Sequence, residues 1–515
     1  MELKKIKLKI KFKIKILLLI LQKNNSMNKI KIIFALIVFF TYSSSAQYTS
    51  FKSQKSKKGY EITGEIVGLD DTSVILAYYF GGKQYAKDTA YSKSGKFTFM
   101  GESELEGGMY LIVLPEQKYF DIIISEQKFS FKSNLKDLVA NMSFKDSKEN
   151  TPFYNYLNFI VDKQKEVAPL KSKMANANGV EKEKLTLKQK EIDNQVTNFR
   201  NKFLSEYPDI FFSTILFASI DPIIPSQPII KNDKKDENFA FNYYKKHFWD
   251  NLDFSDKRIL RTRMFLPKME QYLDKLTAKI PDSIIISSDL LIEKAKENSE
   301  VFKYVLSHIT STYERSKIMG MDAVFVHMVE KYYMTNQCPW IDSTQLAKII
   351  ERAEKISPNL IGKKAPEFID FYGRPFMKDL NGTAHTLESL KAKYTLLVFY
   401  GPTCGHCKKE VPKIKNAVDS LKNLNIDVKS FAVATEFDIE EWKKFLKEQK
   451  IEDWLNVADI SFDDEGNPLA NSDWRDKYDI YSTPVVYLLD KEKKILAKRI
   501  NHDQLKEIIL RLEDL

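Results

Sequence analysis

The sequence predicts three folded regions in series: an all-β sandwich or barrel over 58–140, an all-α region over 150–356 and an α/β region over 360–515. Short apolar runs alternate with turn residues in the first region, and apolar residues recur at helical spacing in the second. In the third, a wholly apolar run precedes a helix pattern, which is typical of a buried strand and its covering helix. The chain has 515 residues, of which 43% are hydrophobic, so each region can bury a core.

Residues 1–46 have the composition of a secretion signal. From Met27, a short basic stretch precedes an apolar run over 32–40 and a small-residue cleavage site at 44–46. The first 26 residues alternate Lys with large apolar residues, so we expect either a true start at Met27 or an unusually long basic segment. The apolar run is shorter than the roughly 20 residues that cross a bilayer, which makes a permanent anchor the less favoured alternative. We therefore expect export to the periplasm or cell envelope.

Net charge and the number of metal-binding side chains exclude several functions. Residues 1–46 contain ten Lys and one Glu, so they supply +9 of the formal +10 and leave +1 (70 minus 69) for the rest. This balance predicts no nucleic-acid partner. With three Cys and six scattered His, the chain lacks the four closely spaced ligands of a zinc site, and we expect no metal. No flavin or nicotinamide motif is present, so no cofactor is predicted.

The region 58–140 is predicted to be all-β from its β-branched and aromatic runs, which turn residues such as Gly81-Gly82 separate. No catalytic group of residues stands out in it. Two alternatives remain open, a module that docks substrates or partners and a purely supporting module. The expected strands are 60–66, 73–79, 96–99, 109–114, 120–124 and 128–131.

The region 150–356 is predicted to be helical from apolar residues that recur every three to four positions. His308, His327 and Cys338 lie in it without metal-binding spacing, so we interpret each of them as structural. The expected helices are 181–202, 210–220, 242–249, 267–278, 288–297, 299–315, 321–333 and 343–355.

Cys404 and Cys407 form the chemical centre that the sequence predicts. The run Tyr394–Tyr400 reads as a strand buried on both faces, and Gly401-Pro402 ends it. The cysteine pair then falls in the first turn of a helix, where unpaired N–H groups and the helix dipole stabilise a thiolate on Cys404. Two intervening residues let Cys407 reach the same sulfur and resolve a mixed disulfide.

With this motif, residues 360–515 resemble the thioredoxin superfamily, and more closely the TlpA/ResA-like thiol:disulfide oxidoreductases. Pro412 matches the proline that kinks the active-site helix of the family. Ser482-Thr483-Pro484, before the expected strand 485–489, matches the cis-proline loop. The resemblance implies a thioredoxin fold in which Thr483 and Pro484 contact the substrate backbone. The β-rich and helical regions resemble accessory domains of the same multidomain proteins.

The resemblance also implies a role for Glu410, which matches the acid that the family places beneath the cysteines. Two positions depart from the wider pattern, because Thr403 stands where tryptophan is usual and Val398 replaces the buried aspartate of ordinary thioredoxin. Proton transfer to Cys407 is therefore expected to fall to Glu410.

His406 leaves the redox direction open. A partly protonated imidazole beside a thiolate stabilises the reduced pair, but the Gly-His dipeptide occurs in oxidising and reducing members alike. A structural disulfide without turnover is one alternative reading of the motif. Peroxidase chemistry is another, but peroxiredoxins keep a threonine where this chain has Gly401.

Taken together, the residues and the resemblance predict an exported thiol:disulfide oxidoreductase. Its expected partners are client proteins with cysteines or disulfides and a membrane or periplasmic thiol protein that donates electrons. Family precedent favours reduction over oxidation of the clients. The alternative is a cell-envelope docking protein whose thioredoxin-fold module does not turn over.

Overall fold

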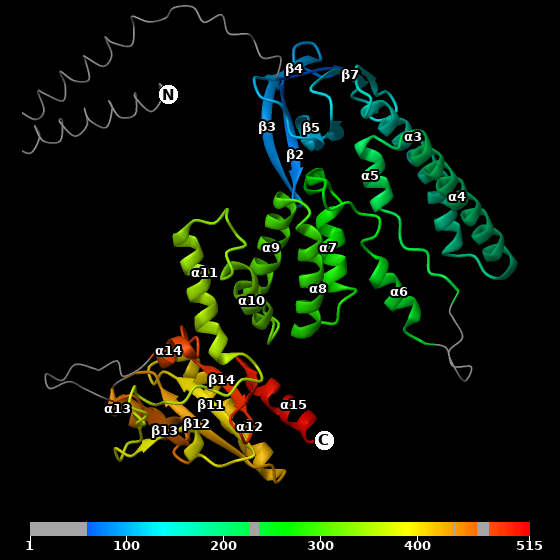
Figure 1. The fold of residues 1–515 in the computed structure, drawn as a ribbon. Coiled ribbons are helices and arrows are strands. Elements are labelled where there is room, and N and C mark those ends of the chain that lie inside the picture. Colours follow the sequence, from blue (N-terminus) through cyan, green and yellow to red (C-terminus); the bar gives the residue numbers. More distant parts are fainter. Residues whose placement is uncertain (1–58, 227–235, 437, 461–472, 515) are drawn as a thin grey trace, which may run out of the picture. The chain divides into compact units, whose positions relative to one another are not determined.

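The computed structural model describes residues 59–226, 236–436, 438–460 and 473–514 (Figure 1). The predicted signal over 1–46 lies outside these residues, so it stays a prediction. Within them, no helix has both the length and the apolar character that crossing a membrane would take. From Tyr60 onward the chain is one compact unit, in which a β-rich, a helical and an α/β region follow one another.

The β-rich region consists of two four-stranded sheets, with orders β4-β1-β7-β8 and β3-β2-β5-β6. Apolar side chains of both sheets, such as Ile62 and Phe131 of the first and Leu76 and Ile122 of the second, belong to one buried cluster. The strands are β1 Tyr60–Val67, β2 Ser73–Phe80, β3 Lys83–Tyr91, β4 Lys96–Gly101, β5 Gly108–Val113, β6 Tyr119–Ile124, β7 Lys128–Asn134 and β8 Ser143–Lys145.

Both sheets are open, and the described residues form no closed barrel. The prediction of a β-rich first region is confirmed, and its barrel alternative is not formed. The apolar pattern does not predict β3 or β8. β3 is an edge strand whose side chains are nearly all exposed, so it carries no hydrophobic alternation. β8 lies beyond residue 140 and pairs with β7.

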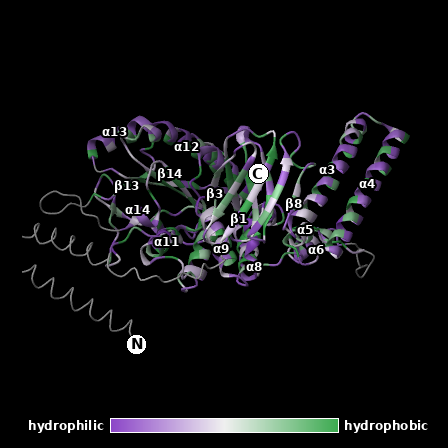
Figure 2. Cartoon of the chain, turned by 90° about the horizontal axis from the view of Figure 1, so that it is seen from above, coloured by the Kyte–Doolittle hydropathy of each residue, from purple (hydrophilic) through white to green (hydrophobic). Residues whose placement is uncertain are grey.

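The helical region begins with α3 (Asn150–Met174) and α4 (Gly179–Glu206), which lie side by side (Figure 1). Figure 2 shows hydrophilic and hydrophobic residues interspersed along both helices, and α4 buries only Ile192 and Phe203. The helices that follow are α5 Phe211–Ala218, α6 Phe239–His247, α7 Phe265–Asp274, α8 Pro281–Ala295, α9 Ser299–Glu314, α10 Asp322–Met328 and α11 Ser343–Ile356.

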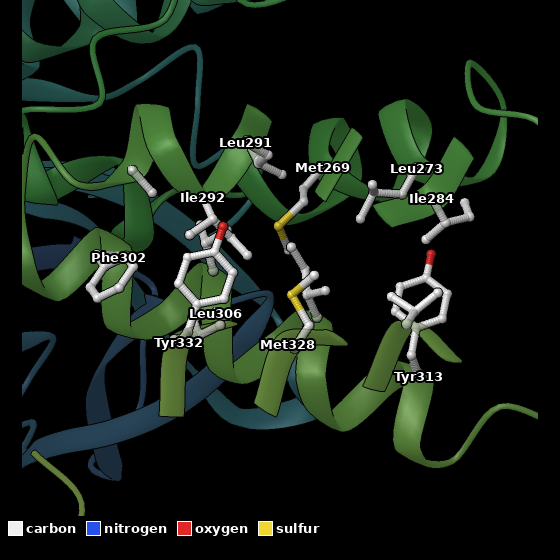
Figure 3. Packing of buried hydrophobic residues seen from close by; sticks show 14 of the residues in the cluster. Met269, Leu273, Ile284, Leu291, Ile292, Phe302, Leu306, Tyr313, Met328 and Tyr332 are labelled. Atoms are coloured by element: carbon white, nitrogen blue, oxygen red, sulfur yellow. The ribbon is translucent and has the colours of Figure 1, made fainter. Parts of the chain in front are cut away.

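The core of the helical region is built by α7, α8, α9 and α10 (Figure 3). The helix expected over 321–333 is an α-helix only as far as Met328, and a π-helical turn over Val329–Tyr333 continues it. This turn points Tyr332 at α8, where its hydroxyl donates to Asp289 Oδ1 at 2.8 Å. His327 also contacts Asp289, at 2.9 Å, so its contacts are those of a helix-packing residue.

The α/β region holds a seven-stranded mixed sheet of order β10-β9-β13-β12-β11-β14-β15. β11, β12 and β13 are parallel to one another, while β14 runs antiparallel to β11. The elements are β9 Met377–Lys378, β10 Ala384–His385, β11 Tyr394–Tyr400, α12 Gly405–Asn423, β12 Val428–Ala434, α13 Ile439–Gln449, β13 Leu455–Ala458, α14 Trp474–Lys477, β14 Val485–Leu489, β15 Ile495–Lys498 and α15 His502–Leu512.

Helices cover both faces of this sheet, which explains why β11 is apolar throughout. Leu396 and Val398 face the cluster that α12, α13 and α15 complete. Leu397 and Phe399 face the opposite cluster, which includes Trp474 of α14. All seven residues of β11 are buried. The strand therefore holds its C-terminal end, where α12 begins, in a fixed position.

A hairpin tip joins the β-rich region to the helical region. The N–H of Gly81, between β2 and β3, donates to Leu260 O at 2.9 Å, and Phe80 packs edge-on against Tyr304. Gly81 has a φ of +55°, and a Cβ there would come within 2.3 Å of the Tyr304 ring. Glycine at this position therefore serves both the left-handed backbone and the close approach.

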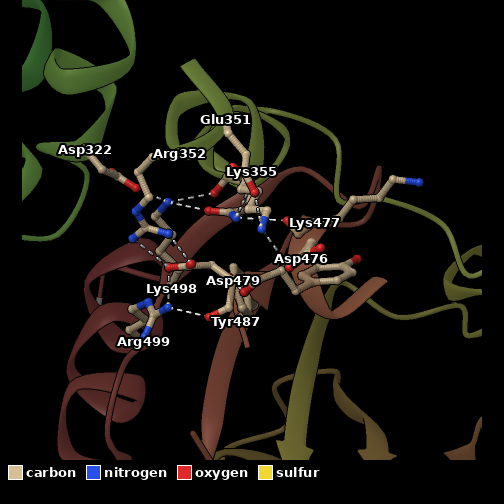
Figure 4. Close-up of polar contacts among 12 residues, drawn as sticks. Asp322, Glu351, Arg352, Lys355, Asp476, Lys477, Asp479, Tyr487, Lys498 and Arg499 are labelled. Carbon is tan, nitrogen blue, oxygen red and sulfur yellow. Dashed lines mark hydrogen bonds and ion pairs between the residues drawn. The ribbon is translucent and has the colours of Figure 1, made fainter. Parts of the chain in front are cut away.

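Ion pairs join the helical region to the α/β region (Figure 4). Arg352 of α11 and Arg499 each lie 2.6 Å from a carboxylate oxygen of Asp479. Burial opposes ionisation of Asp479, but the two guanidinium groups outweigh it and hold its pKa below the ordinary value. Lys498, 6% exposed, pairs with Asp322 of α10 and also donates to Asn359. This pairing places the helical region against the end of β15.

Candidate active site

The redox motif lies where β11 ends and α12 begins. The N-cap of α12 is Cys404, whose φ and ψ of −67° and 117° are extended, and its Sγ accepts a hydrogen bond from Cys407 N at 3.4 Å. The structure places the cysteine pair at the start of α12, as predicted. Pro412 lies inside α12, and a kink there stays a prediction.

Cys404 is half-buried and is the more acidic of the two thiols. Burial raises its pKa, but hydrogen bonds with Thr483 and Cys407 and the N–H groups of Cys407 and His406 outweigh burial. The net shift of the pKa is downward. These N–H groups are the unpaired donors of a helix N-terminus, so the local backbone favours a thiolate at Cys404.

Cys407 is fully buried, and its environment is the opposite one. Burial raises the pKa of Cys407 to about 12, although Gly401 N donates to its Sγ at 3.4 Å. Both cysteines are unpaired thiols in this structure. The site thus holds one thiol that ionises readily beside one that holds its proton.

The loop before β14 lies directly over Cys404. The Thr483–Pro484 peptide is cis, and the Thr483 carbonyl oxygen accepts from Cys404 Sγ at 3.4 Å. A groove of about 600 Å³ follows this loop and is lined by His406, Glu410, Thr483 and Pro484 among others. Four of the six predicted site residues therefore line one groove. Neither cysteine lines it, but Cys404 contacts Thr483 at its edge.

Within the described part of the chain, the contacts recorded for the Glu410 carboxylate are with basic side chains and not with sulfur. Its carboxylate accepts from Lys413 Nζ at 2.8 Å, and His502 Nδ1 lies 3.3 Å from its other oxygen. The hydrogen bond from Lys413 is the largest effect on the Glu410 pKa, which is lowered. Glu410 is therefore an ionised carboxylate that lines the groove.

The motif does not reveal two further residues at this site. Glu436 follows β12 and accepts from Thr403 N at 2.8 Å, so it holds the loop that leads into Cys404. A Cβ at Gly401 would lie 2.4 Å from the same carboxylate, so a threonine there would displace it. Arg499 lines the groove from the end of β15. Glu436 lies at the carboxyl end of a strand parallel to β11, a signal that could have located it.

The described residues contain no cluster of three or more His, Cys, Asp or Glu side chains that could hold a metal ion. The groove also shows no glycine-rich helix start of the kind that binds dinucleotides. What the arrangement can do chemically is thiol–disulfide exchange, because it pairs an accessible acidic thiol with a buried one.

Comparisons with known proteins found similarity in the α/β region. A model described as the AhpC/TSA family matches residues 361–498. A "Thioredoxin-like protein" of Haemophilus influenzae is 30% identical over 139 residues, which cover 25% of this chain and 74% of that protein.

The chain belongs to the thioredoxin superfamily.

Within the superfamily it is a TlpA/ResA-like thiol:disulfide oxidoreductase with additional N-terminal regions. "Thiol-disulfide oxidoreductase ResA" of Bacillus cereus is 28% identical over 148 residues, which are 28% of this chain and 73% of that protein. A solved domain of a possible thiol-disulfide isomerase from Cytophaga hutchinsonii is 39% identical, with a TM-score of 0.25, and covers 30% of this chain and 94% of its own.

The other two regions match families without a described activity. A domain of unknown function (DUF4369) matches residues 60–166, and another (DUF5106) matches residues 177–359. The enzyme assignment of this TlpA/ResA-like protein therefore rests on its α/β region, and its substrates carry thiols or disulfides.

Proposed function

We propose that this protein is exported and reduces disulfides in client proteins of the periplasm or cell envelope. The observation that carries the proposal is the contrast between the two thiols, one accessible with a lowered pKa and one buried with a raised pKa. Such a contrast supports Cys404 as the nucleophile and Cys407 as the resolving thiol.

In the proposed reaction, the Cys404 thiolate attacks one sulfur of the client disulfide. A Cys404–client disulfide forms, and the other client sulfur leaves as a thiolate that takes up a proton. Cys407 then loses its proton and attacks Cys404 Sγ. The second client thiol is released, and the enzyme keeps a Cys404–Cys407 disulfide. Two electrons have passed to the client, and a membrane or periplasmic dithiol protein restores them.

Glu410 is the proposed acceptor of the Cys407 proton. It follows Cys407 by three residues in α12, so both side chains belong to one helix face. Lys413 holds Glu410 ionised, which keeps the carboxylate free of a proton but also lowers its basicity. His502, 3.3 Å from the same carboxylate, could pass that proton to solvent. His406 and the Thr483–Pro484 loop are proposed to tune the thiolate and to bind the client backbone.

The pH dependence of alkylation tests the assignment of the nucleophile. In the reduced protein, Cys404 should react with iodoacetamide with an apparent pKa below the ordinary cysteine value of about 8.5. Below that pKa the thiol is protonated, so the rate should fall about tenfold per pH unit. Cys338 is buried, and burial raises its pKa to about 11, so Cys404→Ala should leave almost no reaction near neutrality. Equal reaction of Cys404 and Cys407 would contradict the assignment.

The reduction potential tests the direction. Equilibration of the mature protein with dithiothreitol or glutathione buffers should give a potential near thioredoxin's, about −270 mV. In strongly oxidising members of this fold the pKa of the attacking cysteine falls to about 3.5. A value of about −120 to −180 mV would overturn the reductase proposal and point to oxidation or isomerisation. Absence of any two-electron transition would favour a docking protein that does not turn over.

A further inference from the structure

We propose that the helical region forms part of the client-binding site of this enzyme. We call the groove along the Thr483–Pro484 loop the redox groove. A cavity beside it lies between the segment 314–320, at the end of α9, and residues of the α/β region. The proposed occupant is an extended client segment that places an apolar side chain in this cavity while its disulfide lies at Cys404. The inference rests on the proposed function, because it names what the same site recognises.

The cavity and the groove along the Thr483–Pro484 loop share part of their lining. The cavity has a volume of about 430 Å³, and the groove over the Thr483–Pro484 loop has about 600 Å³. Arg499, Ile500 and Gln504 line both of them. A polypeptide that lies along the loop therefore contacts residues that also line the cavity.

The helical wall of the cavity is held against the α/β region. Met319 Sδ accepts a hydrogen bond from Lys498 N at 3.4 Å, which ties the segment 314–320 to β15. Asp322, two residues after this segment, pairs with the buried Lys498 Nζ. Figure 4 shows these charged residues together with Arg352 and Asp479. Since the wall is fixed before a client arrives, little ordering entropy opposes binding there.

The lining of the cavity is mixed, because an apolar patch lies among charged residues such as Glu314 and Lys317. Ile318, Met319 and Tyr481 line it and are 50%, 43% and 68% exposed, so a client side chain could cover them. Met is flexible and polarisable, which suits variable peptide partners. Arg352 and Arg499 are already paired with Asp479, and Lys498 with Asp322. An acidic client segment would have to displace these carboxylates, whereas an apolar one would not.

This wall lies outside residues 361–498, which match the AhpC/TSA family. The match to the Bacillus cereus protein covers 148 residues, or 28% of the chain. The segment 314–320 lies in the region matched only by a domain of unknown function. The cavity thus gives that region a part in selecting clients, in addition to any supporting role.

A set of peptide disulfides tests the inference in the full chain. In this set a single Leu is moved stepwise away from the cysteine, and each peptide has a matched Ser version. At the position that reaches the cavity, kcat/KM should be about tenfold higher for Leu than for Ser. Ile318→Asp should bring this ratio close to one. Ile286→Asp, at a more exposed isoleucine of α8 outside the cavity, should keep the ratio of the unchanged protein.

The outcomes separate the inference from the proposed function. If no peptide is reduced by the unchanged protein, the proposed function fails. If peptides are reduced without a Leu preference at any position, or if Ile318→Asp keeps the preference, the inference is wrong and the function stands.

A second measurement needs no turnover. A Leu peptide trapped as a mixed disulfide on Cys404 of the Cys407→Ser chain should slow amide hydrogen exchange in residues 316–320 and 482–486. The matched Ser peptide should slow it mainly in 482–486. Protection confined to 482–486 with both peptides would overturn the inference.

Discussion

Replacement of Cys404 by Ser is expected to lower disulfide reduction by at least about a thousandfold, because the hydroxyl has neither the acidity nor the nucleophilicity of the thiol. Replacement of Cys407 by Ser should stop the reaction at its second step, after the mixed disulfide has formed. The Cys404 thiolate still attacks, but no second thiol resolves the Cys404–client disulfide, which should accumulate. Turnover kinetics and mass spectrometry of the trapped species measure the two effects.

Cys338 provides the matched control for both variants. It is buried in the helical core, with its Sγ 3.7 Å from Tyr332 O, and it lies far from the redox motif in sequence. Cys338→Ser should leave client reduction within about twofold and should trap no client. If Cys404→Ser retained reduction, or if Cys407→Ser trapped nothing, the assigned order of attack would be refuted.

Asp322→Ala is expected to lower the free energy of unfolding where the helical and α/β regions meet by about 3–5 kcal/mol, since it leaves a buried ammonium without its carboxylate. Lys498 is 6% exposed, and burial lowers its pKa even with Asp322 in place. Asn359 would still accept from Lys498 but supplies no compensating charge. Amide hydrogen exchange in α10 and β15 under mild denaturant measures the change locally, because a chain with several regions need not unfold in one step.

The double variant Asp322→Ala/Lys498→Met should recover most of this loss, because it removes both charges and keeps an apolar stem of similar length. Glu351→Ala is the control. It breaks an ion pair with Lys355 in the same set of charged residues, but Glu351 is 62% exposed and the expected cost is below about 1 kcal/mol (Figure 4). A double variant as unstable as Asp322→Ala would show that the charge imbalance is not the cause.

The apolar patterns predict the buried elements well and the exposed ones poorly. Tyr394–Tyr400 is predicted with its observed bounds, because both faces of β11 are covered and every residue is apolar or shielded. β3 is not predicted, because its residues are exposed and only its hydrogen bonds to β2 define it. The end of α10 at Met328 is not predicted either, because the π-helical turn after it keeps the same apolar spacing to Tyr332.

At the site, too, some residues can be predicted from the sequence, and others become apparent only once the chain is folded. Cys404 and Cys407 are predicted from a motif within a single turn, and Pro484 from its resemblance to the cis-proline loop of the family. Glu436 reaches Thr403 across 33 positions of sequence, and Arg499 reaches the groove from another strand. Their proximity depends on the order of strands in the sheet, which no local pattern encodes.

The exposure that hides β3 from a pattern search also bears on self-association. β3 is the edge of its sheet, and no strand among the described residues is hydrogen-bonded to its outer side. The outward-facing backbone groups of this nine-residue strand would offer a second copy a template for strand addition. Lys83, Lys87 and Asp88 place charges along this edge, and an added strand would have to desolvate them. The charged residues of β3 thus oppose pairing of this open sheet edge with the same edge of a second copy.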